Sequence, residues 1–359
     1  MNKPLAHGSV IGILGGGQLG RMLSVAASRL GYKTHIFEPT SNPPAGDVAF
    51  EVTTAPYSNE EALERFAKSV DIITYEFENI PTAALDILER VRPIHPNREA
   101  LRVSQDRCVE KQFLNKIGLK TAPFADVSSL KELEAAVNDI GAPSILKTRR
   151  FGYDGKGQVR LTPESNLAEA YEAIGEQLAV LEGFVSFIRE VSVIGARNAA
   201  GDVACFDPGE NVHKDGILDT TTVPAQISAA QRMDAVLLTA KIMNALEYVG
   251  VMGVELFVTG AGLIVNEIAP RVHNSGHWTQ DGCAVDQFEQ HIRAITGWPL
   301  GDGSRYCDVR MENLIGQDVG RVKMLAGEKN VALHLYGKAE IKAGRKMGHL
   351  NRILAKETG

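Results

Sequence analysis

The sequence has few cysteines and no long apolar run, and each absence excludes a class of protein. Its four cysteines lie far apart along 359 residues, at Cys108, Cys205, Cys283 and Cys307. None of the close spacings typical of zinc sites or disulfide frameworks is present. No apolar stretch approaches the roughly 18 residues that a membrane span needs, and the first residues lack the pattern of a secretory signal. We therefore expect a cytoplasmic protein without disulfides or a structural zinc site.

The charge balance lacks the excess of basic residues that marks a polyanion-binding surface. The chain has 38 Lys and Arg residues against 44 Asp and Glu residues, a formal net charge of −6. It therefore gives no reason to expect nucleic acid or a membrane as a partner. Hydrophobic residues make up 44% of the chain and charged residues 23%, as in globular proteins. The length predicts two or three domains, and we expect small-molecule ligands.

Strand patterns and helix patterns alternate through the first hundred residues, which predicts an α/β fold that begins with a parallel sheet. The predicted strands there are 10–14, 33–38 and 71–78, and the helices are 21–30, 60–69 and 81–91. A charged helix at 106–117 leads into a smaller αβ segment with a helix at 129–139 and a strand at 144–150. A third region starts near Glu182 and has strand patterns at 187–196 and 203–208, a helix at 229–248, a hairpin, and a tail (330–353) with a strand and a basic segment.

The first glycine motif follows the first strand. Gly15, Gly17 and Gly20 form G-x-G-x-x-G before a predicted helix, and Glu38 ends the next strand. That pattern is typical of dinucleotide-binding folds. Glycines at a helix N-terminus let backbone amides approach any phosphate group, so the motif predicts a phosphorylated ligand more generally. A purely structural turn and a nicotinamide-dependent dehydrogenase remain alternatives.

A second glycine-dense segment, residues 152–158, lies between two predicted strands. Three of its seven residues are glycine, a density that suggests a loop that moves or approaches a ligand closely. Lys147 lies in the apolar strand just before the loop. Because an inward-pointing lysine without a counter-charge is costly, we expect an anionic partner, and a phosphate chain between Lys147 and the loop amides accounts for both features.

Two glutamates in the segment 253–271 predict a metal site. Two alternating strands flank the turn-like sequence TGAG, and a turn centred near residue 261 places Glu255 opposite Glu267. Facing side chains in such a pair lie about 5 Å apart, so the two charges repel unless a cation lies between them. Mg²⁺ prefers carboxylate and phosphate oxygens. Asn266 adds a ligand only if the backbone twists, and a register shifted by one residue leaves one glutamate in solvent.

The segment that follows the hairpin is rich in polar side chains, with Arg271, His273, Asn274, Ser275 and His277 within seven residues. A single buried histidine is usually a structural residue. Five hydrogen-bonding groups beside a metal hairpin instead predict a loop that binds an oxyanion, in which an arginine holds bicarbonate or an acyl phosphate.

Together these motifs resemble the ATP-grasp superfamily, and within it the 5-(carboxyamino)imidazole ribonucleotide synthetases of purine biosynthesis. The resemblance extends over nearly the whole chain and rests on the order and spacing of the segments. They are GILGGGQLGRML, TYEFENIP, SQDRCVEKQFL, KTRRFGYDGKGQ, LEGFVSFIREVSV, DPGENVHKDGILDTT, NEIAPRVHNSGHWT and GRKMGHLN.

The resemblance implies an ATP site between a central and a C-terminal domain, with Mg²⁺ bound to Glu255 and Glu267. Arg107 and Lys147 would contact the phosphates, and Glu190 the ribose hydroxyls. The remaining implied nucleotide residues are the loop Gly152, Tyr153, Asp154, Gly155, Lys156, Gly157 and Gln158, the hinge Glu182, Gly183, Phe184 and Val185, and also His213 and Asn266.

The resemblance assigns the N-terminal glycine turn to aminoimidazole ribonucleotide. The implied contacts are Gly17, Gln18, Leu19, Glu76, Asn79 and Tyr153, with Lys338, Arg345 and Lys346 of the C-terminal segment on the ribonucleotide phosphate. The implied catalytic residues are Asp154, Lys156, Arg271, His273 and Asn274. Other members carry arginine at the position of Lys156, which leaves its role open. Asp154 is a plausible proton acceptor by side-chain type alone.

The resemblance also implies the reaction, the architecture and the assembly. Bicarbonate would attack the γ-phosphate of ATP to give carboxyphosphate, which would deliver its carboxyl group to the amine of the ribonucleotide. The expected domains are a Rossmann-like domain (1–105), a central αβ lid domain (106–181) and a larger C-terminal αβ domain (182–359), in a homodimer. Alternatives are a formate-dependent glycinamide ribonucleotide transformylase, a biotin carboxylase relative, and a nucleotide-sensing protein without activity.

Overall fold

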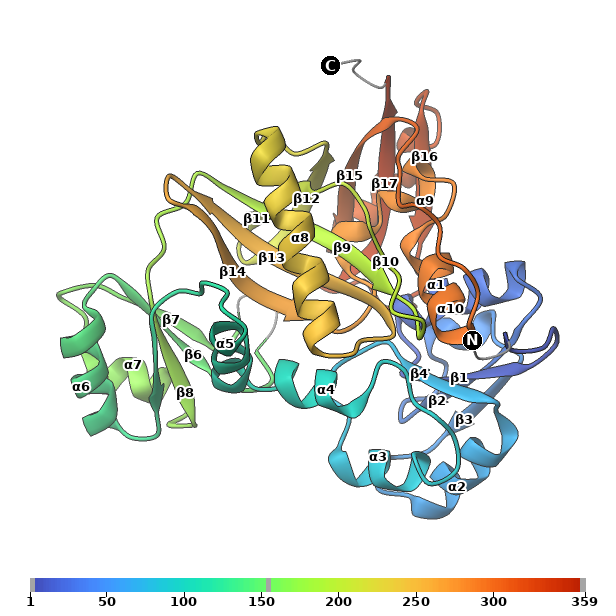
Figure 1. Cartoon of the computed structure of the whole chain (residues 1–359), viewed down its shortest axis with the longest axis horizontal. Coiled ribbons are helices and arrows are strands. Elements are labelled where there is room, and N and C mark those ends of the chain that lie inside the picture. The colour runs from blue at the N-terminus through green and yellow to red at the C-terminus, as the bar shows by residue number, and fades with distance from the viewer. Residues whose placement is uncertain (1–3, 153–155, 356–359) are drawn as a thin grey trace.

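The computed structural model describes residues 4–152 and 156–355, which form three sheets (Figure 1). The N-terminal sheet has four parallel strands in the order β3-β2-β1-β4, as the alternating pattern predicted. Its elements are β1 (Val10–Leu14), α1 (Gln18–Arg29), β2 (Lys33–Glu38), β3 (Glu51–Thr54), α2 (Glu60–Ser69), β4 (Ile72–Tyr75), α3 (Thr82–Leu88) and α4 (Arg98–Ser104).

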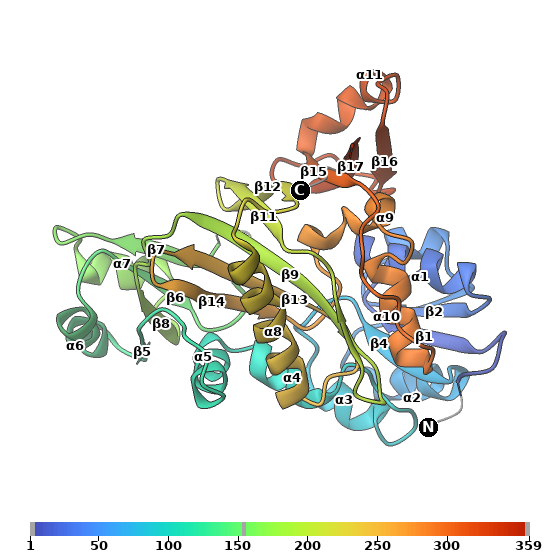
Figure 2. The same cartoon turned by 45° about the horizontal axis from the view of Figure 1, so that its top comes forward.

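The central part is a four-stranded antiparallel sheet, in the order β5-β8-β6-β7, that has its own hydrophobic core. Its elements are α5 (Arg107–Lys116), β5 (Phe124–Val127), α6 (Leu130–Ile140), β6 (Ser144–Thr148), β7 (Gln158–Leu161), α7 (Leu167–Ala173) and β8 (Ala179–Gly183). It projects at the left of Figures 1 and 2, away from the N-terminal sheet. Strand β8 extends two residues past the expected boundary at residue 181.

The C-terminal part is a nine-stranded sheet that follows the path β14-β13-β9-β11-β12-β15-β17-β16, with β10 paired to β9. The strands are β9 (Arg189–Arg197), β10 (Val203–Cys205), β11 (Gly209–Lys214), β12 (Ile217–Val223), β13 (Gly250–Thr259), β14 (Gly262–Ala269), β15 (Asp308–Ile315), β16 (Val331–Leu335) and β17 (Lys346–Leu354). The helices are α8 (Ala229–Ala245), α9 (Thr279–Gly282), α10 (Gln287–Thr296) and α11 (Val322–Leu325).

The tail was expected to form one strand followed by a basic segment, and the structure differs from this expectation. The tail forms two strands, and the basic segment runs into the second of them because Met347–Leu350 are buried against the sheet. None of the helices formed by the described residues has the length and apolar character needed to cross a membrane.

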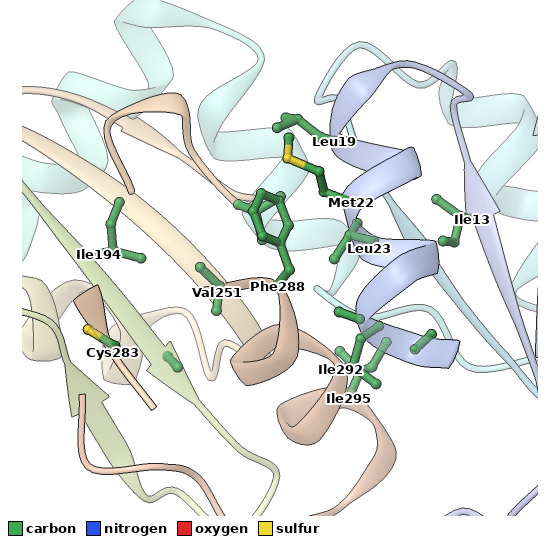
Figure 3. Close-up of a cluster of buried hydrophobic side chains, with 14 of the residues drawn as sticks. Ile13, Leu19, Met22, Leu23, Ile194, Val251, Cys283, Phe288, Ile292 and Ile295 are labelled. Atoms are coloured by element: carbon green, nitrogen blue, oxygen red, sulfur yellow. The ribbon is translucent and has the colours of Figure 1, made fainter. Parts of the chain in front are cut away.

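The N-terminal and C-terminal parts share one hydrophobic core (Figure 3). Met22 and Leu23 of α1 face Phe288 and Ile292 of α10, and the cluster continues to Val251 of the large sheet. Because side chains from both parts are buried together, the N-terminal and C-terminal parts form one packed unit. The central sheet has a hydrophobic core of its own.

Candidate nucleotide and metal site

The hairpin β13–β14 places Glu255 directly opposite Glu267, as predicted. The two-residue turn at Gly260 and Ala261 alone would have paired Glu255 with Asn266. A β-bulge between Leu256 and Glu255 moves the pairing by one residue, because Asn266 is an extra residue in β14. The bulge also turns the Asn266 amide toward Glu255, with 3.5 Å between Nδ2 and Oε2. The backbone twist that Asn266 needs in order to act as a third ligand is therefore present.

The two facing carboxylates differ in their electrostatic surroundings. Burial and the charge of Glu267 raise the pKa of Glu255 to about 7. Burial also acts to raise the pKa of Glu267, but the positive charges of Arg107 and Lys147 lower it overall. Arg107 donates from Nη1 to Glu267 Oε2 at 3.2 Å. Two acids held this close share a need for positive charge, and their oxygens are the ligands that Mg²⁺ prefers.

Lys147 has its counter-charge within the chain. It lies on the same face of the central sheet as Glu182, and its Nζ donates to Glu182 Oε2 at 2.9 Å. A second lysine, Lys111 of α5, lies 3.3 Å from Glu182 Oε1. All three side chains are at most 12% exposed. The expectation that phosphate is the anionic partner of Lys147 was therefore incomplete, because it treated Glu182 only as a backbone contact.

The hinge residues after Glu182 link the central sheet to the large sheet. The amides of Gly183 and Phe184 already donate to the carbonyl oxygens of Pro123 and Pro143, at 2.8 and 3.2 Å. These two amides therefore already have partners, and an adenine contact through the hinge backbone would have to use its carbonyl groups or Val185. Phe184 is 41% exposed, and the Arg160 guanidinium lies 4.8 Å from the centre of its ring.

Glu190 and His213 lie side by side on the neighbouring strands β9 and β11, with 2.7 Å between Glu190 Oε2 and His213 Nδ1. Burial acts to lower the pKa of His213, but the hydrogen bond to Glu190 and the charge of Glu255 raise it. Glu190 pairs with Phe257 of β13, two residues along the strand from Glu255, so this pair adjoins the β13–β14 hairpin. Sequence analysis assigned both residues to the nucleotide, and the structure brings them together.

One described end of the second glycine loop lies beside Arg107, and the other lies beside Thr148. A Cβ atom added at Gly152 would lie 3.6 Å from Arg107 Nη2. Gly157 has a φ of +70°, and a Cβ there would lie 2.7 Å from Thr148 Oγ1, so a side chain is excluded. Lys156 and Gln158 are exposed. Tyr153, Asp154 and Gly155 lie outside the described residues.

The polar loop after the hairpin faces the same site. His273 Nε2 lies 3.6 Å from Glu255 Oε1, and its Nδ1 lies 2.8 Å from Ser275 Oγ. Burial and Arg271 lower the pKa of His273 to about 3. The side-chain amide of Asn274 is buried, and among the described residues neither of its polar atoms has a hydrogen-bond partner. A neutral imidazole and an unsatisfied amide are able to accept or donate to a small oxyanion.

Arg271 binds a carboxylate of the chain. Its Nε and Nη2 donate to the two oxygens of Glu78, at 2.6 and 3.3 Å. His277 is fully buried, away from the metal pair, and Gln287 contacts its Nδ1 at 3.0 Å. That this loop binds an oxyanion stays a prediction, and Arg271 already has a partner in Glu78 that its sequence position did not indicate.

The N-terminal glycine turn holds carboxylates of the chain. Gly20 donates to Glu76 Oε2 at 2.6 Å, the amide of Gly17 donates to Glu76 Oε1, and Gly16 donates to Glu38 Oε2 at 2.8 Å. A Cβ at Gly17 would lie 2.6 Å from Glu76 Oε1, so this glycine lets the carboxylate approach. Glu76 thus supplies the negative charge that a helix N-terminus favours, and a phosphorylated ligand at this turn stays a prediction.

The other predicted ribonucleotide contacts surround this turn. Gln18 is half-buried and Asn79 is exposed, whereas the side chain of Leu19 belongs to the shared core. Leu19 therefore has only its backbone to offer a ligand.

The C-terminal basic residues lie beside the N-terminal part. A Cβ at Gly337 would lie 3.1 Å from Asp47 Oδ2, so the segment after β16 touches the region that follows β2. Lys338 Nζ donates to the carbonyl oxygen of Lys346 at 2.8 Å, and Arg345 donates to that of Glu340 at 3.1 Å. The charge of Lys346 contributes to the lowered pKa of His273. The tail thus joins the polar loop to the N-terminal domain.

Sequence analysis missed one charged face of helix α5. Arg107, Glu110 and Lys111 follow the i, i+3, i+4 spacing of a single helix face, and Leu114 continues it. Glu110, Lys111 and Leu114 are buried. The signal was present in the spacing, because charged residues in register with Leu114 face the protein interior.

Three family models match consecutive parts of the chain. They are the ribonucleotide synthetase preATP-grasp domain (residues 9–105), the ATP-grasp domain (112–288) and the phosphoribosylaminoimidazole carboxylase C-terminal domain (310–358). A solved ADP complex of an N5-carboxyaminoimidazole ribonucleotide synthetase matches with a TM-score of 0.95 at 40% identity, covering 98% of this chain and 94% of that one. The fold and the site thus define an ATP-grasp ligase, which confirms the predicted fold class.

The relatives specify the family. The N5-carboxyaminoimidazole ribonucleotide synthase of Brucella melitensis is 54% identical over 352 residues, 97% of each chain. That of Bacillus subtilis is 42% identical, covering 98% of this chain and 93% of the relative. A structure from Aspergillus clavatus in complex with ADP and 5-aminoimidazole ribonucleotide matches with a TM-score of 0.92 at 31% identity, covering 98% and 95%. The chain belongs to the N5-carboxyaminoimidazole ribonucleotide synthase family, as the motifs indicated.

Proposed function

We propose that this chain carboxylates 5-aminoimidazole ribonucleotide with bicarbonate and ATP, giving 5-carboxyaminoimidazole ribonucleotide, ADP and phosphate, in purine biosynthesis. Family membership supports the reaction. The observation that carries it is the facing pair Glu255 and Glu267, with Arg107 on Glu267 and Lys147 nearby. Phosphoryl transfer needs its charge neutralised and its reactants aligned, and this cluster provides both.

For the nucleotide, the two facing glutamates and Asn266 are the residues that would hold Mg²⁺, and the metal would supply positive charge to neutralise the phosphates. Arg107 and Lys147 contact the phosphates, while Lys111 keeps Glu182 paired. The loop 152–158 closes over the phosphates, the hinge 182–185 faces the adenine, and Glu190 and His213 face the ribose. Support comes from contacts among the described residues: Arg107 donates to Glu267 and lies beside Gly152, and Glu190 pairs with Phe257 of β13.

For the chemistry, a bicarbonate oxygen attacks the γ-phosphorus and ADP leaves, which gives carboxyphosphate. The exocyclic amine of the ribonucleotide then attacks the carboxyl carbon, phosphate leaves, and the amine loses a proton. His273, Asn274 and Arg271 line the oxyanion side, with Asn274 free to bond the reacting oxygens. Asp154 takes the proton and Lys156 stabilises the phosphate. Because carboxyphosphate hydrolyses readily, a closing loop protects it from water.

For the ribonucleotide, the glycine turn provides a rigid platform. Gln18 and Leu19 offer backbone groups, Gly17, Glu76 and Asn79 lie near the ribonucleotide, and Tyr153 faces the reacting groups. The phosphate is met by Lys338, Arg345 and Lys346, since carboxylates already occupy the amides of the turn. We also propose the three domains given above, and a cytoplasmic homodimer, on the strength of the resemblance and the four free cysteines.

The direct test is phosphate release from MgATP and bicarbonate, measured with and without aminoimidazole ribonucleotide. We expect strong stimulation by the ribonucleotide together with a carboxylated product. If formate replaced bicarbonate and another ribonucleotide were the acceptor, the ATP-grasp site would stand and the proposed substrate would be wrong.

Replacing Arg345 with alanine should raise the Michaelis constant for the ribonucleotide by about tenfold or more. A hydrogen bond to a charged group is worth about 1.5–3 kcal/mol, and tenfold corresponds to about 1.4 kcal/mol. The constant for ATP should change less than about twofold. Lys342→Ala is the matched control, because this exposed lysine of the same loop pairs with Glu340. Equal changes for both substrates would remove Arg345 from the ribonucleotide phosphate.

A further inference from the structure

Strand β14, which contains Glu267, lies at the edge of the nine-stranded sheet. The outward amides of an edge strand have no partner within the sheet. Two of them are satisfied from helix α5 and the segment that follows it. Val265 donates to the carbonyl oxygen of Lys120 at 2.8 Å, and Ile268 donates to Glu110 Oε1 at 2.8 Å. The central domain therefore contacts the large sheet at the residue next to Glu267.

The two outward amides are three residues apart. In a regular strand they would alternate with a period of two. The extra residue is Asn266, at the bulge that brings Glu267 opposite Glu255. The hydrogen bonds of Val265 and Ile268 therefore hold the bulge from its two sides, and the second bond depends on one buried side chain, Glu110, which is 4% exposed.

Glu110 belongs to a helix face whose other members reach the nucleotide site. Arg107, three residues earlier, donates to Glu267, and Lys111, the next residue, pairs with Glu182. Helix α5 thus contacts β14 through Arg107 and Glu110, and it contacts β8 through Lys111.

We propose that Glu110 is a positioning residue for the metal site: its carboxyl oxygen holds the bulged backbone at Ile268 and so aims the Glu267 carboxylate. Glu110 acts through the backbone and contacts neither the nucleotide nor the metal. The inference rests on the proposed function, since it takes Glu255 and Glu267 as the Mg²⁺ ligands. Groups that orient metal ligands change metal affinity by about 10–100-fold when removed.

The test uses two variants of nearly equal size in the full-length protein. Glu110→Gln keeps an acceptor oxygen, and Glu110→Leu removes it. Calorimetry gives the affinity for ADP with Mg²⁺ and with the metal chelated, and the ratio of the two is the gain due to the metal. We expect the Gln variant to keep the wild-type gain and the Leu variant to lose about tenfold of it, with little change in metal-free ADP affinity.

Each outcome decides between the claims. A wild-type gain in the Leu variant would overturn the role of Glu110. Absence of any gain in the wild-type protein would instead refute the metal site itself. If the Leu variant does not fold, Glu110→Asp replaces it, because this side chain keeps the acid but is one methylene too short to reach Ile268. A full gain in the Asp variant would then overturn the proposal.

Discussion

Replacing Glu267 with glutamine is expected to reduce turnover by at least about 1,000-fold while leaving the fold intact. Glutamine has the size of glutamate but no charge, so it removes one of the two facing carboxylates and the partner of Arg107. Metal-assisted charge stabilisation is worth several kcal/mol in a transition state, and about 4 kcal/mol corresponds to 1,000-fold. Steady-state phosphate release at saturating ATP and a range of Mg²⁺ concentrations measures the loss.

Two further variants make the result specific. Glu255→Gln should cause a loss of similar size, because it removes the opposite member of the pair. Glu172→Gln on the surface of α7 should leave turnover unchanged, because this glutamate is exposed and far from the hairpin. Ordinary activity of Glu267→Gln, with an unchanged melting temperature, would show that the hairpin does not hold the metal.

The hairpin β13–β14 shows how much of the candidate site could be predicted from the sequence. Alternating apolar residues around TGAG were sufficient to pair two strands and to bring Glu255 and Glu267 together. The pairing was right although the turn is centred between Gly260 and Ala261, because a bulge restores the register. Sequence periodicity does not locate that bulge, since the side chain that accepts from the outward amide of Ile268, Glu110, lies 158 residues earlier in the chain.

The N-terminal turn shows the opposite case. The glycine spacing correctly predicted a strand, a tight turn and a helix, and it favoured a phosphorylated ligand at the helix N-terminus. It did not identify the carboxylate of Glu76, because a phosphate and this carboxylate satisfy the same amides. The location of Glu76, directly after a buried strand that neighbours β1, was the available signal.

Charged residues inside helix α5 were the main omission. A helix with Arg107, Glu110 and Lys111 reads as solvent-exposed when only composition is considered. Arg107 and Glu110 contact Glu267 and Ile268 in β14 of the large sheet, and Lys111 pairs with Glu182 in β8 of the central sheet. Only the assembled fold reveals those partners, although the register of the charges with buried Leu114 pointed inward.

Replacing Glu182 with glutamine is expected to destabilise the central domain by about 3–5 kcal/mol, the range for breaking a buried ion pair from one side. The variant leaves Lys111 and Lys147 close together, 3% and 12% exposed, without their shared carboxylate. Amide hydrogen exchange in the β6–β8 ladder measures the local stability. As a control, Glu64→Gln breaks the exposed pair with Lys68 on α2 and should change stability by less than about 1 kcal/mol.

A double variant separates charge from packing. In Lys111→Met with Glu182→Gln, one lysine remains buried beside a neutral amide, and the repulsion between two lysines is gone. If unpaired charge causes the loss, Lys111→Met should cost less in the Glu182→Gln background than in the wild-type protein, where it removes one of the two cations that hold Glu182. Equal costs in both backgrounds would mean that Lys111 contributes only packing. Unequal costs would establish that the charge of Lys111 is coupled to the Glu182 carboxylate, which Lys111 of α5 and Lys147 of β6 both contact.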